Sequence, residues 1–155
     1  MCNLTKLTKK KSVIIYKVVY KYVHPDTGEV FYYSLYAGTP VKVGSVIPQD
    51  RNIREEVIEV IGISEGDFYD YDDSCMFYNY NHIGRTSGLK LLSDAKALMK
   101  DLEDNDDVEN VAIIKLQISN SIFIGDCDRF ASNIIPENHI IYAGKHIDSL
   151  EEVKF

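Results

Sequence analysis

The sequence has no tryptophan, little cysteine and proline, and no long apolar run. Its three cysteines are odd in number and none lie at C-x-x-C spacing, which argues against a disulfide framework or a structural zinc site. No segment approaches the roughly 18 consecutive apolar residues of a membrane-spanning helix. Free thiols and the lack of a spanning segment favour a cytoplasmic protein with no membrane partner.

Basic charge is scarce as well. The 155 residues include 17 lysines and arginines against 24 aspartates and glutamates, which gives a net charge of −7 at pH 7. Proteins that bind nucleic acid directly usually have the opposite balance, because they neutralise phosphates. We therefore expect no direct nucleic-acid partner. The length fits one globular domain.

The residue pattern predicts a short tail followed by one domain. Residues 1–11 are rich in lysine and are expected to form a flexible basic tail, so residues 12–155 form the domain. Segments rich in β-branched residues and tyrosine predict strands. These strands are expected at 12–23, 29–36, 41–47, 111–118, 122–124 and 140–142. His24–Gly28, which contains proline, aspartate and glycine, predicts the turn between the first two strands.

Two segments carry apolar residues at helical spacing. Ser93–Leu102 has one apolar stripe, and Ser93 is a suitable N-cap. Residues 53–61 also fit a helix, although 57–63 alternates passably as a strand. The order of strands and helices predicts an α+β domain, with a mainly antiparallel sheet and about two helices packed on one face.

The start of the chain resembles a group of small uncharacterised phage and bacterial proteins. Met1–Lys6 and Ile15–Val19 match their opening Met-Cys-x-(Ile/Leu/Val)-Thr-Lys and the Val-Tyr-Lys-Val strand that soon follows. Gly88–Ala95 is similar to a segment of theirs that opens a helix, although Lys90 stands where they tend to have histidine. The resemblance implies a phage-type origin and a shared fold, and it implies no activity.

Cys2 is a candidate catalytic residue. Removal of Met1 would expose its thiol beside an α-amine, whose pKa of about 8 suits a neighbouring base, as in N-terminal nucleophiles. Alternatively, Cys2 is an incidental cysteine on a basic tail. No P-loop, nucleophile elbow or dinucleotide fingerprint is present. The sequence therefore leans towards a protein without enzyme activity and leaves the question open.

An aromatic and acidic segment, residues 65–85, is a candidate protein-binding surface. Its candidate contact residues are Tyr69, Asp70, Tyr71, Asp72, Asp73, Tyr78 and Tyr80. Exposed tyrosines supply much of the binding energy at protein interfaces, and aspartates favour a basic partner surface. Alternatively, some of these rings belong to the core and the aspartates solvate a loop.

The turn Gly84–Gly88 is a candidate anion site. Flexible backbone amides, two hydroxyls and a guanidinium before a helix suit the phosphate of a nucleotide. The candidate anion-binding residues are Arg85, Thr86, Ser87 and Lys90. The alternative is a plain turn. No group of residues has the spacing of a zinc or calcium site, so we expect neither metal nor cofactor.

These patterns favour a small phage-type accessory protein that acts by binding, as an inhibitor of a host protein or of a host defence system in the cytosol. The lack of an enzyme motif and the aromatic segment support this interpretation. Two alternatives stay open. One is a nucleotide-like ligand binder, or an enzyme that uses the Gly84–Gly88 turn with or without Cys2. The other is a structural component of the virion. The sequence does not fix the oligomeric state.

Overall fold

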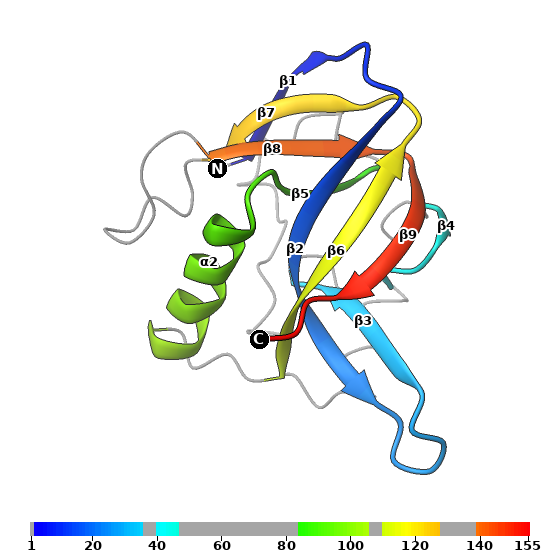
Figure 1. Cartoon of the computed structure of the whole chain (residues 1–155), viewed down its shortest axis with the longest axis vertical. Helices are drawn as coiled ribbons and strands as arrows, with labels where there is room; N and C mark the ends of the chain where they lie inside the picture. Colours follow the sequence, from blue (N-terminus) through cyan, green and yellow to red (C-terminus); the bar gives the residue numbers. More distant parts are fainter. Residues whose placement is uncertain (1, 36–39, 47–83, 106–109, 128–138) are drawn as a thin grey trace, which may run out of the picture.

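The computed structural model describes residues 2–35, 40–46, 84–105, 110–127 and 139–155. In these residues the chain forms a nine-stranded antiparallel sheet and one helix (Figure 1). The strands are β1 (Cys2–Leu7), β2 (Ser12–Val23), β3 (Val30–Ser34), β4 (Gly44–Ser45), β5 (Thr86–Leu89), β6 (Val111–Ser119), β7 (Phe123–Cys127), β8 (His139–Gly144) and β9 (His146–Glu152), and the helix is α2 (Leu92–Asn105). The prediction of a mainly antiparallel sheet is confirmed.

Strand β2 is the centre of the sheet. Its residues 12–20 pair with β6 along one edge. Its other edge pairs with β5 at Tyr16 and with β3 from Val19 to Val23. Isoleucine, valine and tyrosine make up most of this 12-residue strand, as the β propensity of these residues favours.

The strands close into a ring, because β8 and β9 are separated by Lys145 alone. β8 pairs with β5 and β9 pairs with β6, while β5 and β6 both pair with β2. The corner is tight: the amide of Lys145 donates a hydrogen bond of 2.9 Å to the carbonyl oxygen of Asn120. β7 extends the sheet beyond β8, and β1 pairs with β7 (Figure 1).

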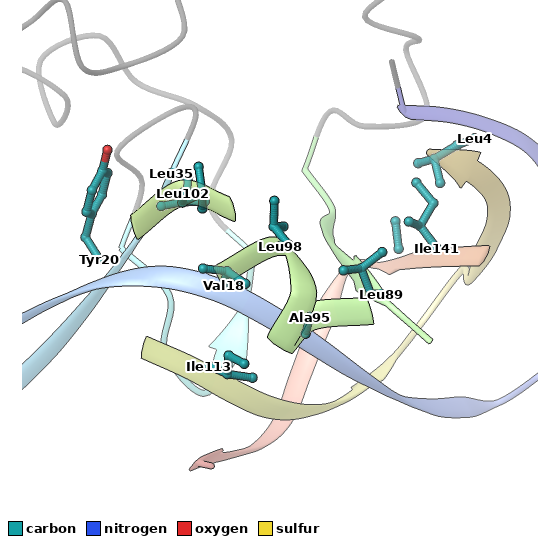
Figure 2. Close-up of a cluster of buried hydrophobic side chains, with 11 residues drawn as sticks. Leu4, Val18, Tyr20, Leu35, Leu89, Ala95, Leu98, Leu102, Ile113 and Ile141 are labelled. Carbon is teal, nitrogen blue, oxygen red and sulfur yellow. The ribbon is translucent and has the colours of Figure 1, made fainter. Parts of the chain in front are cut away.

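The ring has an apolar core on each of its faces. The helix-side core lies between the sheet and α2 (Figure 2), and its buried residues are Leu4, Val18, Tyr20, Leu35, Leu89, Ala95, Leu98, Leu102, Ile113, Ile141 and Ala143. The inner core lies on the face that the ring encloses, and its buried residues are Ile15, Val19, Val41, Ile114, Leu116, Ile118, Ile122, Tyr142 and Ile147. β6 contributes Ile113 to the first core and Ile114 to the second, which explains its nearly continuous apolar sequence.

The structure confirms several elements and corrects others. The strand expected at 12–23 is β2, and the helix expected at Ser93–Leu102 lies within α2. α2 begins at Leu92, so Ser93 is a helical residue and not the N-cap. The strand expected at 41–47 is limited to Gly44–Ser45. The helix expected at 53–61 lies outside the described residues, so two helices are not confirmed.

Strands β1, β5 and β9 were not predicted. Cys2–Leu7, expected in a flexible tail, pairs with β7, and Leu4 is fully buried. Thr86–Leu89, expected mostly in a turn, pairs with β8. His146–Glu152 pairs with β6 although it contains several charged residues. Each strand is stabilised by partners far away in the sequence, so local composition gives little sign of it.

Within the described part of the chain, α2 is too short and too polar to cross a membrane. Its apolar residues instead face the sheet, where Ala95, Leu98 and Leu102 are buried in the helix-side core. Lys96 and Lys100 are exposed on the opposite side of the helix.

Gly88 lies where β5 approaches β2 closely. A Cβ atom at this position would lie 2.8 Å from the carbonyl oxygen of Tyr16 and 2.9 Å from Cδ1 of Ile15. Because a backbone atom would have to move, we expect Gly88→Ala to lower the free energy of unfolding by about 1–3 kcal/mol. Urea denaturation measures this change. The exposed Lys90→Ala is the matched control, expected within about 0.5 kcal/mol of wild type. Equal urea midpoints for the two variants would contradict this close approach of β5 to β2.

Candidate functional site

The turn between β2 and β3 is built by its own side chains. The amide of His24 donates to the carbonyl oxygen of Glu29 at 2.8 Å, and Gly28 has a φ of 72°. The amides of Asp26 and Thr27 both donate to Nδ1 of His24, at 3.2 and 3.3 Å. The predicted turn is confirmed, and the ring of His24 accepts hydrogen bonds from two of its backbone amides.

The end of this hairpin projects beyond the rest of the sheet (Figure 1). The pairing of β2 with β6 ends at Tyr20, and Lys21 donates its amide to Asn110. Beyond that point, Tyr22 pairs only with Phe31, and Val23 only with Val30. The projecting part therefore consists of two strands with no third strand beside them among the described residues.

Apolar and aromatic side chains cover this projecting part, which we call the hairpin end and define as Tyr22, Val23, His24, Val30 and Phe31. Val23 is 50% exposed and Val30 is 40% exposed. The rings of Tyr22 and Phe31 lie 6.2 Å apart, and His24 meets Tyr22 edge-on at 6.4 Å. Such cross-strand pairs stabilise a two-stranded ribbon, which is marginal alone. Val23 and Val30 are the next register pair, so they lie on the opposite face of the hairpin from Tyr22 and Phe31 and form an exposed apolar pair there.

Glu152 on β9 anchors the base of the hairpin to the ring. Its carboxylate accepts a hydrogen bond from Tyr32 Oη at 3.0 Å and forms an ion pair with Lys21 Nζ at 2.9 Å. Lys21 and Tyr32 are register partners on β2 and β3, so one carboxylate holds both strands. Charge-assisted bonds of this kind are stronger than neutral ones.

The anchor changes the pKa of both acidic groups in it. Burial raises the pKa of Glu152, but the hydrogen bonds from Lys21 and Tyr32 and the charge of Lys21 outweigh this effect, so the pKa lies below its usual range. Burial, the hydrogen bond to Glu152 and the negative charge of that residue raise the pKa of Tyr32 to about 12. Glu152 is therefore ionised, and Tyr32 is a hydrogen-bond donor, at neutral pH.

Lys17 places a cation on the inner face of the ring, between Ile15 and Val19. Its Nζ donates a hydrogen bond of 2.8 Å to the carbonyl oxygen of Ser87 on β5. In the part of the chain that the structure describes, no carboxylate pairs with it. Burial of the amino group lowers its pKa from 10.5 to about 8. Lys17 thus holds β5 against β2 while its charge is poorly solvated.

Cys2, the predicted nucleophile, is located on strand β1. Its register partner is Cys127 on β7, and two residues further along β1 Leu4 is buried in the helix-side core. The segment expected to form a flexible basic tail is paired in the sheet, and this placement does not distinguish a catalytic from an incidental cysteine. The catalytic role of Cys2 stays a prediction.

The four predicted anion-binding residues are engaged in the sheet or spread along it. Arg85 donates to Ser121 through Nε (2.9 Å to the carbonyl oxygen) and Nη2 (2.6 Å to Oγ), and its guanidinium lies 4.6 Å from the ring centre of Phe123. Thr86 is buried in β5, and the carbonyl oxygen of Ser87 accepts from Lys17. Lys90 is exposed and its amide pairs with Ile140. Arg85 and Ser87 hold β5 to its neighbours, and the role of the four residues as an anion site stays a prediction.

The other predicted surface is not described. Tyr69, Asp70, Tyr71, Asp72, Asp73, Tyr78 and Tyr80 all lie outside the described residues. Sequence reasoning found the hairpin turn, but it did not identify the hairpin end as a candidate surface. The available signal was the pairing of Val23 with Val30 immediately beside the predicted turn, where no further strand was expected.

Neither a metal centre nor a known relative assigns a site to this chain. Among the side chains that the structure describes, no three from histidine, cysteine, aspartate and glutamate gather as metal ligands would. No protein-family model, no curated protein and no solved structure matches the chain. The hairpin end and its Glu152 anchor are the strongest candidate site among the described residues.

The anchor predicts an acid-sensitive contribution to stability. Because the pKa of Glu152 is lower in the folded chain, its stabilisation is complete at neutral pH and is lost as the pH falls through that pKa. We expect Glu152→Gln to lower the free energy of unfolding by about 1–3 kcal/mol at pH 7. The difference in the free energy of unfolding between Glu152→Gln and wild type should become smaller at acidic pH. Urea denaturation at several pH values measures it, with the exposed Glu151→Gln as control. A difference in the free energy of unfolding that is independent of pH would contradict the stabilising role of ionised Glu152.

Replacement of Lys17 is expected to have the opposite effect on stability at pH 7 to replacement of Glu152. Its pKa is lowered to about 8 in the folded chain, so the unfolded chain binds the proton more tightly and stability rises as the pH rises from about 8 towards 10.5. We expect Lys17→Met to be more stable than wild type at pH 7, with the difference shrinking at pH 10. The exposed Lys115→Met is the control. Urea midpoints at both pH values measure the difference. If Lys17→Met lost the same stability at pH 7 and at pH 10, the result would contradict an unfavourable burial of the Lys17 charge.

Proposed function

We propose that this chain is a phage-type accessory protein that acts by binding another protein in the cytosol of a host cell, as an inhibitor of that protein or of a defence system. The observation that carries the proposal is the projecting hairpin end with its exposed apolar surface. Val23 and Val30 are two of the seven exposed large apolar residues in the described part of the chain, and they are register partners at the end of the hairpin. Clustered exposed apolar residues mark interaction surfaces.

The hairpin end suits a contact surface because both of its strands are held at the base. One strand is the end of β2, the central strand, the other is the start of β3, and Glu152 contacts Lys21 on the first and Tyr32 on the second. A surface that is ordered before binding loses less conformational entropy on association. The opposite face of the hairpin carries Tyr22, and tyrosine is one of the residue types enriched at interface hot spots.

The charge distribution indicates the kind of partner. Asp26 and Glu29 are exposed beside the hairpin end, and the whole chain has a net charge of −7. We infer a protein partner with an apolar depression and a basic rim, because opposite potentials accelerate encounter and exclude wrong partners. The aspartates at 70, 72 and 73 would favour the same partner. The resemblance to small phage proteins supports an inhibitor of a host protein.

Capture from a lysate of the host bacterium tests the proposal. The double variant Val23→Ser/Val30→Ser removes the apolar surface, and we expect at least a tenfold loss of affinity for the captured protein, about 1.4 kcal/mol. Native mass spectrometry gives the partner, and titration of the purified partner gives the affinity. Leu91→Ser is the matched control, because Leu91 is 52% exposed on another part of the chain.

Two outcomes contradict the proposal. If the double variant binds the partner as wild type does, the hairpin end is not the contact surface. If the triple variant Tyr69→Ala/Tyr71→Ala/Tyr78→Ala alone loses binding, the contact surface is the aromatic and acidic segment instead. Equal unfolding midpoints for all variants show that the losses come from the surface and not from misfolding.

A further inference from the structure

Two links that are far apart in the sequence bring four lysines to one end of the ring. One link joins β1 to β2 and the other joins β8 to β9. The amide of Thr8 in the first donates a hydrogen bond of 2.8 Å to the carbonyl oxygen of Ile122, and the amide of Lys145 in the second donates one of 2.9 Å to that of Asn120. Both links therefore contact the turn between β6 and β7, at the upper right of the sheet (Figure 1). We call their lysines the basic corner: Lys9, Lys10, Lys11 and Lys145.

The backbone of the basic corner is held in place by hydrogen bonds. Oγ1 of Thr8 donates a hydrogen bond of 2.9 Å to the carbonyl oxygen of Ile122 and accepts one of 3.3 Å from the amide of Lys10. The other link is the single residue Lys145, which lies between two paired strands. A surface that is ordered before it binds loses less conformational entropy on association.

The four lysines present uncompensated positive charge. All four side chains are exposed, and none of them forms an ion pair with another residue that the structure describes. The nearest described carboxylate along β9 is Asp148, which accepts a hydrogen bond of 2.8 Å from Ser119 and lies 2.8 Å from Nδ1 of His146. Arg85 adds a further positive charge at this end, because its guanidinium donates hydrogen bonds to Ser121 in the β6–β7 turn.

Negative charge lies at the other end of β2. Asp26 and Glu29 are exposed beside the hairpin end. Ser12, which follows the first link, and Val23 are about 36 Å apart along the strand, at about 3.3 Å per residue. Exposed charges further apart than about 8 Å are largely screened at physiological salt. The net charge of −7 alone argues against an anionic ligand, but it does not describe the potential at the basic corner.

We propose that the basic corner binds the phosphate backbone of a nucleic acid without sequence specificity. Lysine is a compact charge that binds phosphate oxygens. Three of the lysines follow one another along the chain and the fourth contacts the same turn, so the corner offers a series of charges to a linear polyanion. Double-stranded DNA presents such a series, with one negative charge per about 1.7 Å of its axis. The proposal is independent of the partner-binding function, which depends on the far end of β2.

Fluorescence anisotropy with labelled oligonucleotides tests the proposal. The full chain is titrated into a single strand and into a duplex, each of about 20 nucleotides per strand, at salt concentrations from about 50 to 200 mM. We expect affinities in the micromolar range at the lowest salt. For the duplex, the slope of log K against log salt concentration should be about −3 to −4, because four phosphate contacts release counterions.

Lys145→Gln is the most informative variant, because only the fold brings Lys145 beside the other three lysines. We expect this variant to make the salt slope shallower by about 1, as the loss of one phosphate contact does. The triple variant Lys9→Gln/Lys10→Gln/Lys11→Gln should lower the affinity at least tenfold at about 50 mM salt. Equal urea midpoints for the variants and wild type show that each variant is folded.

Two matched variants check the location of the site. Lys96→Gln/Lys100→Gln/Lys115→Gln removes the same charge as the triple variant from exposed lysines elsewhere. We expect it to bind within about twofold of wild type, because screening limits the effect of distant charges. Val23→Ser/Val30→Ser should bind the oligonucleotides as wild type does. A failure of the hairpin end as a protein-binding surface therefore leaves this result unchanged.

Four results overturn the proposal. The first is no change in anisotropy with either oligonucleotide at about 50 mM salt. The second is an unchanged salt slope in Lys145→Gln, which would make the lysine run alone the binding element. The third is an equal loss of affinity in the matched triple variant, which would mean that only net charge matters. The fourth is equally tight binding to poly-glutamate or to phosphatidylserine vesicles, which would indicate an acidic protein or a membrane surface as the ligand.

Discussion

The pairing of β2 with three other strands is the constraint on which the rest of the structure depends. β6 occupies one edge, and β5 and β3 share the other. A strand buried on both faces must be apolar on both, and β2 places Val18 in the helix-side core and Ile15 and Val19 in the inner core. The ring closes because β5 and β6 both pair with this strand and both meet the continuous β8–β9 segment.

The same strand links stability to the candidate function. Its first part is fixed within the ring, and its last residues extend beyond β6 as one side of the hairpin. The two lysines on its inner face have different surroundings. Lys21 is paired with Glu152, whereas Lys17 is buried against a carbonyl oxygen. The first interaction positions the hairpin, and the second brings β5 to β2 despite unfavourable burial of a charge.

Sequence reasoning succeeded where a signal is local and failed where it depends on distant partners. β2 and β6 are apolar and β-branched along their length, and the turn at His24–Gly28 has its own chemistry, so all three were predictable. β1 and β5 contain lysine, glycine and serine, and they are strands because β7 and β8 offer free edges. The hydrogen bonds from Arg85 to Ser121 were not predicted, because the two residues are 36 positions apart in the sequence. No local pattern could indicate that contact.

The candidate site also combines features with a local sequence signal and features that depend on distant strands. The hairpin turn could be predicted, but the exposure of Val23 and Val30 depends on β6 beginning at Val111, which lies opposite Tyr20. Cys2 and Cys127 are register partners because β1 pairs with β7, and these two strands are far apart in the sequence. The aromatic and acidic segment was the clearest surface signal in the sequence, and it lies outside the described residues.

Site-specific photo-crosslinking in host cells tests most directly whether the hairpin end is the contact surface. The photoreactive residue benzoylphenylalanine is placed at position 30, and at position 91 as a control of similar exposure. Our account predicts one discrete crosslinked host protein from position 30 and none from position 91. The absence of a crosslink at position 30, or the same products from both positions, would contradict it.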